Sequence, residues 1–194
     1  MNKDKIILGV DPGTRVMGYG IISVQGSVLT LIQYGVIKLD KYSSHELKLK
    51  KIFERITQLI TEYLPDEMAI EAPFYGVNVQ SMLKLGRAQG VAIAAAMNRE
   101  VPTVEYLPKK VKQSVTGNGN ATKEQVAYML EHLLKVKLEA QFLDATDALG
   151  VAVCHFMHGK TKALTGNSSK SKGWSAFVSE NPERMKTPPP ASPQ

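Results

Sequence analysis

The hydrophobic positions of the chain alternate between runs typical of buried strands and spacings typical of amphipathic helices. Lys5–Val10 is a short, almost wholly apolar run that stops at a Pro-Gly turn, as in a strand buried on both faces. Two β-rich stretches follow, 18–24 and 28–39, and Gln25-Gly26-Ser27 joins them as in a hairpin. We therefore expect three consecutive antiparallel strands at the start of the chain.

The next segment predicts a helix and a fourth strand. Between residues 46 and 63 apolar side chains recur three and four residues apart, which predicts an amphipathic helix on one face of the sheet. After Pro65, Met68-Ala69-Ile70 is a short apolar run that ends at Glu71. Because this strand and the first are both short, apolar and followed by an acid, we expect them to be neighbours in the centre of the sheet.

The second half of the chain is mainly helical. Residues 79–98 predict a helix rich in Gly and Ala, whose small side chains allow the protein's own sheet or a second subunit to approach closely. A fifth strand is expected at 101–107, followed by helices at 109–116, 122–134 and 143–158. This order of elements predicts a mixed α/β fold, with a five-stranded sheet flanked by helices.

All of these elements lie in residues 1–158, which are expected to form one domain. Residues 159–194 are rich in Lys, Ser, Gly and Pro, which predicts a basic, Pro/Ser-rich disordered tail. The tail holds six Lys/Arg and two acids, so +4 of the formal net charge of +6 resides there and +2 in the domain. This charge fits a polyanionic partner, and solubility alone explains it equally well.

The sequence predicts a cytoplasmic protein without membrane contact. The longest nearly apolar run, Gly90–Met97, is too short to cross a bilayer, and no signal peptide precedes the first strand. The single cysteine, Cys154, fits a reducing compartment. It shares a helix face with His158, but no second pair of ligands completes a zinc site, so we expect both to pack at a helix end.

Four acidic residues are candidates for a metal site. Asp11 and Glu71 each close a buried strand, at the sheet edge where α/β proteins bind ligands. Asp144 and Asp147 lie three residues apart, on one face of the first turn of a helix. Carboxylates that converge in this way repel one another and are stabilised by a cation, for which oxygen ligands favour Mg²⁺ or Mn²⁺. Two such ions, about 3.5–4 Å apart, can hydrolyse a phosphodiester.

Local structure alone accounts for three of these acids. Asp11 precedes a Pro-Gly turn, Asp144 is a good helix N-cap, and Asp147 is favourable in a first helical turn. Glu71 has no turn or capping reason to close an apolar strand. It is therefore the most informative acid on pattern alone.

Four stretches carry further motifs. Asp11-Pro-Gly-Thr-Arg15 leads to Gly18-Tyr-Gly20, and Ala69-Ile-Glu-Ala-Pro-Phe74 follows. Leu83-Lys-Leu-Gly-Arg-Ala-Gln-Gly90 continues into Val91 and Ala92, and Asp144-Ala-Thr-Asp-Ala-Leu149 is the last. Together, and in this order, they resemble the crossover junction endodeoxyribonucleases of the RuvC family over residues 5–158.

The resemblance implies an RNase H-like nuclease domain over residues 1–158. It implies a homodimer that binds four-way (Holliday) junction DNA and makes paired symmetric nicks in recombination and repair. It also implies that a catalytic set binds Mg²⁺, two ions per subunit with Mn²⁺ as a substitute: Asp11, Glu71, Asp144 and Asp147. A branch-migration helicase complex is the further partner that it implies.

The resemblance also bears on residues that would hold DNA. Phe74 falls in the family's Ile-Glu-x-x-Phe pattern, where an exposed aromatic ring can stack on a base unpaired at the crossover, with Tyr75 as a partial substitute. Without the resemblance, a core phenylalanine is the preferred interpretation. Lys112 and Lys123 flank the glycine-containing loop 117–120 and fall where the family places lysines near the site. Either can position the scissile phosphate or stabilise charge in the transition state.

Three alternatives remain open. The motif Asp11-x-Gly-Thr also opens the phosphate loop of actin-like ATPases and sugar kinases, although the chain lacks the second half that those enzymes need. A non-catalytic DNA-binding subunit of the same fold would have no reason to retain all four acids. Another RNase H-like nuclease, such as one acting on ribosomal RNA precursors, is the nearest alternative.

Overall fold

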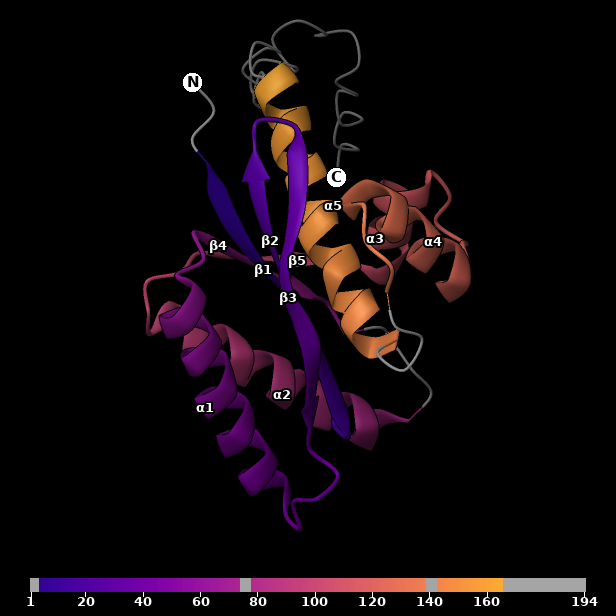
Figure 1. Ribbon diagram of the computed structural model, residues 1–194. Coiled ribbons are helices and arrows are strands. Elements are labelled where there is room, and N and C mark those ends of the chain that lie inside the picture. The colour runs from indigo at the N-terminus through magenta and orange to yellow at the C-terminus, as the bar shows by residue number, and fades with distance from the viewer. Residues whose placement is uncertain (1–3, 74–77, 139–142, 166–194) are drawn as a thin grey trace, which may run out of the picture. The chain divides into compact units, whose positions relative to one another are not determined.

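Five strands and five helices make up the part of the chain that the computed structural model describes, residues 4–73, 78–138 and 143–165 (Figure 1). The strands are β1 (Lys5–Asp11), β2 (Val16–Gln25), β3 (Val28–Lys38), β4 (Glu67–Glu71) and β5 (Thr103–Tyr106). The helices are α1 (His45–Tyr63), α2 (Val79–Met97), α3 (Pro108–Thr116), α4 (Lys123–Leu134) and α5 (Leu143–Thr165). The strands and helices predicted from the sequence are all present.

The strands form one mixed sheet in the order β3-β2-β1-β4-β5. β1, β2 and β3 are joined by antiparallel ladders, whereas β4 pairs in parallel with both β1 and β5. The predicted antiparallel trio and the predicted pairing of the first and fourth strands are therefore confirmed. In the parallel register Val10 lies opposite Ile70, so the residues that end β1 and β4 emerge side by side at one edge of the sheet.

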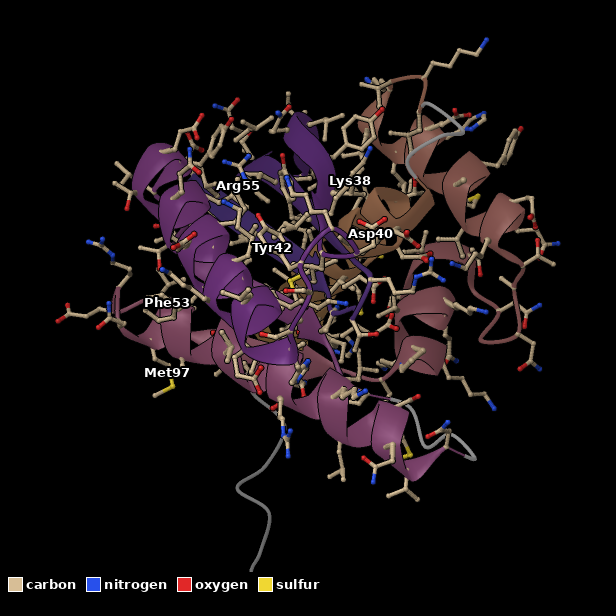
Figure 2. The ribbon with its side chains drawn as sticks, turned by 90° about the horizontal axis from the view of Figure 1, so that it is seen from below. Lys38, Asp40, Tyr42, Phe53, Arg55 and Met97 are labelled. Carbon is tan, nitrogen blue, oxygen red and sulfur yellow. The ribbon has the colours of Figure 1, made fainter. Side chains whose placement is uncertain are left out.

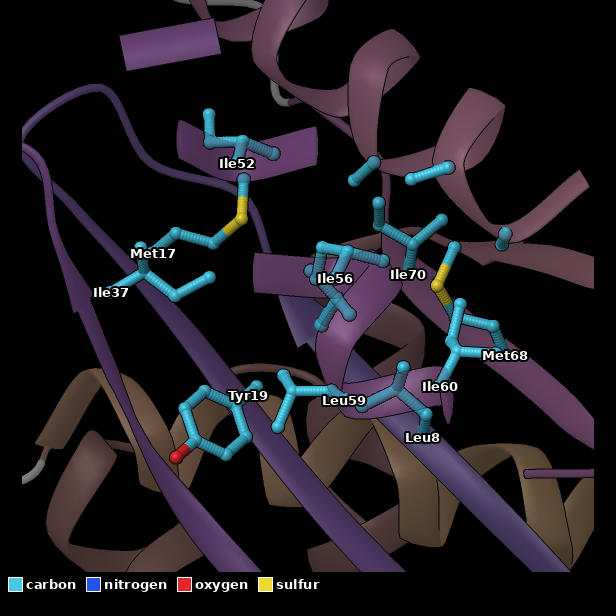
Figure 3. Close-up of a cluster of buried hydrophobic side chains, with 14 of the residues drawn as sticks. Leu8, Met17, Tyr19, Ile37, Ile52, Ile56, Leu59, Ile60, Met68 and Ile70 are labelled. Atoms are coloured by element: carbon cyan, nitrogen blue, oxygen red, sulfur yellow. The ribbon is translucent and has the colours of Figure 1, made fainter. Parts of the chain in front are cut away.

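Alternating side chains divide the sheet between two cores. Leu8 and Val10 belong to the core that includes residues of α1 and α2, drawn in Figure 3. Ile7 lies in the second core, which contains residues of α3, α4 and α5. A buried Leu or Ile stabilises the fold by about 1.5–3 kcal/mol relative to an exposed one, so each face binds its helices firmly.

The inner face of α2 packs against the protein's own sheet, which is one of the two possibilities that its small residues left open. Its alanines at positions 88, 92, 95 and 96 are buried in the core against the sheet and α1. These small side chains therefore allow close packing within the chain itself.

Glycines let α5 lie directly on the backbone of β1 and β2. A Cβ atom at Gly9 would overlap the carbonyl oxygen of Ala148, and one at Gly18 would overlap the carbonyl oxygen of Asp144. At Gly20 it would press against Leu149. The absence of three side chains thus sets how closely the first turns of α5 approach the ends of the central strands.

Two details of α5 differ from the predictions. It begins at Leu143, so Asp144 lies within the first turn and the N-cap interpretation is wrong. It also passes through Gly159 and continues to Thr165, so the predicted end at His158 is wrong. One glycine in a helix costs only about 1 kcal/mol relative to alanine, and no proline follows to stop the helix.

The predicted disordered tail falls largely outside the described residues. Residues up to Lys160 form one compact unit, and most of the remainder is not described. The division into a domain of residues 1–158 and a tail of 159–194 stays a prediction. Among the described helices, none is both long and apolar enough to cross a membrane.

The packing of α5 on glycine can be tested with Gly18→Ala. The added methyl must displace the first turn of α5, and overpacking of this kind costs about 1–3 kcal/mol. Urea denaturation should show a lower free energy of unfolding. The control is Gly159→Ala on the same helix, where the methyl meets open space and stability should be unchanged or slightly raised. A Gly18→Ala variant as stable as the parent would contradict the account.

Candidate metal centre

Three of the four carboxylates predicted to converge lie together at one end of the central strands. Asp11 ends β1, Glu71 ends the neighbouring parallel strand β4, and the first turn of α5 supplies Asp144 and Asp147. Carboxylate oxygens of Asp11, Asp144 and Asp147 all lie within 4.8 Å of one another. The side chain of Glu71 is close enough to interact electrostatically with Asp11 and Asp147.

Each acid reaches the cluster for a local reason. Asp11 shares the alternating face of β1 with Ile7 and Gly9, which is the face covered by α5. Asp144 and Asp147 are three residues apart on a helix and so point the same way. They also lie at the helix N-terminus, whose partial positive charge favours acids.

The electrostatics of Asp11 show how unfavourable this cluster is without a cation. Burial, followed by the charges of Glu71, Asp147 and Asp144, raises the pKa of Asp11 from 3.8 to about 8. Lys123 acts in the opposite direction. The metal-free site therefore holds a proton that an isolated aspartate would release.

Glu71 is perturbed in the same way. Burial, followed by the charge of Asp147, raises its pKa from 4.5 to about 7, while Lys123 and Lys112 oppose the rise. Two half-buried carboxyls with raised pKa values, together with Asp144 and Asp147, form a donor set of hard oxygens. Mg²⁺ and Mn²⁺ prefer such ligands, so the residues present fit a divalent cation.

The two lysines predicted near the site differ in their contacts. Lys123 is the first residue of α4, and its Nζ donates a hydrogen bond to Asp147 Oδ2 at 2.6 Å. This bond raises the pKa of Lys123. Lys112, on α3, acts on Glu71 through its charge. The capping box predicted from Thr122 and Gln125 starts α4 and so fixes the base of the Lys123 side chain.

The cluster opens into a small hollow of about 150 Å³. Its walls are Asp11, Pro12, Glu71, Ala72, Pro73 and Leu85. Larger hollows of about 630 and 410 Å³ lie along α1 and beside α4. Within the described ranges, three potential metal ligands come together only at the end of β1, as Asp11, Asp144 and Asp147. The small hollow beside them is therefore the candidate reaction site.

Two further predictions concern residues away from the acids. Cys154 is buried with its Sγ 3.3 Å from Ser114 Oγ, and the ring of His158 packs against that of Tyr106. Both pack within the protein, as expected, but they do not lie at a helix end, because α5 continues to Thr165. Phe74 and Tyr75 lie outside the described residues.

Sequence reasoning missed the residues that support the cluster from behind. Gly9 and Gly20 are isolated glycines within strands, a pattern that signals close backbone approach, but their partner on α5 is distant in sequence. Gln89 is buried on α2 and its amide lies near the backbone of Glu71. Gln89 belongs to the motif Leu83–Gly90, but the sequence alone assigned it no role.

Known proteins with similar sequences identify the family. The family model described as crossover junction endodeoxyribonuclease RuvC matches residues 7–155. This chain belongs to that family. A RuvC crossover junction endodeoxyribonuclease of Cytophaga hutchinsonii is 65% identical over 187 residues, which cover 96% of this chain and 90% of the relative. The relative of the same name from Porphyromonas gingivalis is 54% identical and covers 95% of this chain and 98% of its own.

Solved structures agree with the RuvC family assignment. Thermus thermophilus RuvC in complex with a Holliday junction substrate has a TM-score of 0.76 at 28% identity, over 81% of this chain and 96% of that chain. The yeast mitochondrial Holliday junction resolvase Ydc2, at 12% identity and a TM-score of 0.57, supports the fold alone. The predicted RNase H-like fold and enzyme class, an endodeoxyribonuclease that hydrolyses phosphodiester bonds, are confirmed. The ATPase alternative is wrong.

The raised pKa values predict how the stability of the metal-free protein depends on pH. A carboxyl whose pKa is raised on folding binds its proton more tightly in the folded state, so its contribution to stability is lost as pH rises toward the folded pKa. With EDTA, the free energy of unfolding should fall between pH 6 and 8, by at most about 1.4 kcal/mol per pH unit for each proton released. Denaturation curves at several pH values measure this slope.

Two controls identify the source of the slope. Asp11→Asn removes the carboxyl with the largest shift and should flatten it. Saturating Mg²⁺ should abolish or reverse it, because the cation binds the deprotonated ligands. Stability that rises steadily from pH 6 to 8 without metal would show that the carboxylates do not repel one another in this way.

Proposed function

We propose that this chain resolves four-way (Holliday) junctions by hydrolysing one phosphodiester bond in each of two opposed strands. The observation that carries the proposal is the convergence of three carboxylates within 4.8 Å in a chain of the RuvC family. The paired, symmetric nicks would leave two duplexes, which serves recombination and repair. The junction complex of the Thermus thermophilus relative supports the choice of substrate.

The four acids are proposed to hold two Mg²⁺ ions in each subunit, with Mn²⁺ as a substitute. Asp11 interacts electrostatically with all three other acids. The ions would be held by Asp11 from β1, Glu71 from β4, and Asp144 and Asp147 from α5. When bound, two such ions activate a water and stabilise the leaving oxygen of the phosphodiester.

The lysines are proposed to act on the phosphate. The ammonium of Lys123 already reaches the cluster through Asp147, so a phosphate oxygen placed at the acids would come within its range. Lys112 approaches the same centre near Glu71. Fixed positive charge at these two points can orient the scissile group and stabilise the charge that develops during cleavage.

DNA positioning is proposed to involve Phe74. It follows Glu71 by three residues in the sequence, so an aromatic residue lies within a few positions of a proposed metal ligand. Stacking on an unpaired base would fix the crossover relative to the acids. Tyr75 is the neighbouring aromatic that can share this role.

The outer face of α2 supports the proposed homodimer. Apolar residues and glycines recur along it three, four and seven residues apart: Val79, Leu83, Gly86, Gly90 and Met97. Side chains at the two ends are largely exposed, 65% for Val79 and 68% for Met97, and Met97 projects away from the ribbon in Figure 2. A Cβ atom at either glycine would meet nothing within 4 Å, so a second helix can approach closely.

Two further parts of the proposal rest on the sequence and the resemblance. A branch-migration helicase complex is the expected partner of a junction endonuclease of this family. A cytoplasmic location follows the sequence prediction.

The proposed chemistry predicts that Asp11→Asn or Glu71→Gln abolishes cleavage and spares junction binding. Each change removes a metal ligand while it keeps the side-chain volume. Synthetic four-way, duplex and DNA–RNA hybrid substrates, incubated with and without Mg²⁺, measure cleavage, and gel shifts in Ca²⁺ measure binding. Glu54→Gln on the exposed side of α1 is the control and should cut normally.

The relative cleavage of the three substrates also distinguishes a junction resolvase from an RNA-directed nuclease. Selective, Mg²⁺-dependent nicking of the four-way junction is the expected result. Cleavage by Asp11→Asn at the parental rate would overturn the metal assignment, and preference for the hybrid would favour an RNA-directed nuclease.

The dimer predicts that Leu83→Glu yields a monomer. A charge buried in the middle of an apolar helix interface is costly without a partner. Sedimentation at micromolar concentration should show the mass of one chain, 21.3 kDa, whereas the parent should show twice this mass. Leu64→Glu, at a position that is 74% exposed at the end of α1, should remain dimeric. If Leu83→Glu also remains dimeric, the interface lies elsewhere.

A further inference from the structure

Gln89 is a buried polar side chain on the inner face of α2. It is 7% exposed, and among the described residues only Gln89 and Thr146 are both polar and buried. Its amide nitrogen donates a hydrogen bond to Glu105 Oε2 at 2.8 Å and lies 3.5 Å from the backbone oxygen of Glu71. One amide group thus connects α2, β5 and the end of β4.

Packing alone does not call for glutamine here. The other buried positions of α2 are all alanine, and burying an amide costs free energy unless it is hydrogen-bonded. Both N–H groups of the Gln89 amide are directed to acceptors at the end of the sheet. The side chain therefore serves those acceptors.

The ladder between β4 and β5 stops close to Gln89. The pairing of β4 with β5 extends to the hydrogen bond from Ala72 N to Tyr106 O, at 2.8 Å. Pro73 follows, and Pro12 follows Asp11 on the neighbouring strand. Proline has no N–H to donate, so a side-chain donor is useful where these strands stop.

We propose that Gln89 is a positioning residue for the metal ligand Glu71. By binding the peptide oxygen of Glu71 and the carboxylate of Glu105, it fixes the backbone from which the Glu71 side chain enters the cluster. Leu85, one turn earlier on α2, lines the hollow with Asp11 and Glu71, so this part of the helix lies directly behind the site. The proposal rests on the proposed metal-dependent function.

The first test is Gln89→Leu, which keeps the approximate volume and removes the donor. Mn²⁺ binding to the DNA-free full chain, measured by calorimetry, should weaken about 10- to 100-fold, as for other groups that orient metal ligands. The Mg²⁺ concentration for half-maximal cleavage should rise similarly. Junction affinity without divalent ions should be unchanged. Gln58→Leu, an exposed glutamine on α1, is the matched control and should behave as the parent.

An exchange of partners separates positioning from simple structural support. The double variant Gln89→Glu with Glu105→Gln restores a hydrogen bond between α2 and β5, but now the donor belongs to β5. The backbone oxygen of Glu71 then faces a carboxylate. Thermal stability should recover relative to Gln89→Glu alone, whereas Mn²⁺ affinity should stay low.

The outcomes distinguish the two proposals. If the parent chain and Gln58→Leu fail to cut a four-way junction in Mg²⁺, the proposed function fails. If both cut and Gln89→Leu binds Mn²⁺ as tightly as the parent, the role of Gln89 is overturned. It is equally overturned if the exchanged pair recovers Mn²⁺ affinity together with stability.

Discussion

The close contact between α5 and the backbone of β1 and β2 is the constraint on which the rest of this structure depends. A helix that packs on ordinary side chains is held farther from a sheet than one that packs on glycine, where the backbones can approach closely. Gly9, Gly18 and Gly20 remove the intervening side chains, so Asp144 is held against β2 through its own backbone. The positions of the two acids on α5 therefore depend on glycines, which have no side chain.

The second constraint is electrostatic and opposes the first. Packing that brings four acids together raises the pKa of Asp11 to about 8 and that of Glu71 to about 7, so the metal-free site is destabilising at neutral pH. Lys123 offsets part of this repulsion through Asp147. Burial of hydrophobic side chains on both faces of the sheet stabilises the fold against the remainder. A divalent cation would convert the repulsion into binding free energy.

The sequence predicted most of the fold because strand and helix periods are local signals. The apolar runs that end at Asp11 and Glu71 were sufficient to place their strands side by side. Boundaries were less accurate: α5 runs through Gly159, since tertiary packing outweighs the small cost of one helical glycine. The acids were identified by position, but the supporting residues were not. Gly20 meets Leu149, and Gln89 meets Glu71, across separations in sequence that no local pattern reveals.

We propose that packing of α5 on the central strands allows Asp11, Glu71, Asp144 and Asp147 to hold two divalent ions. Anomalous scattering from crystals of the full chain soaked in Mn²⁺ tests it most directly. Two peaks are expected, about 3.5–4 Å apart, among these four carboxylates. A single ion, or Mn²⁺ bound away from Asp11 and Glu71, would contradict it.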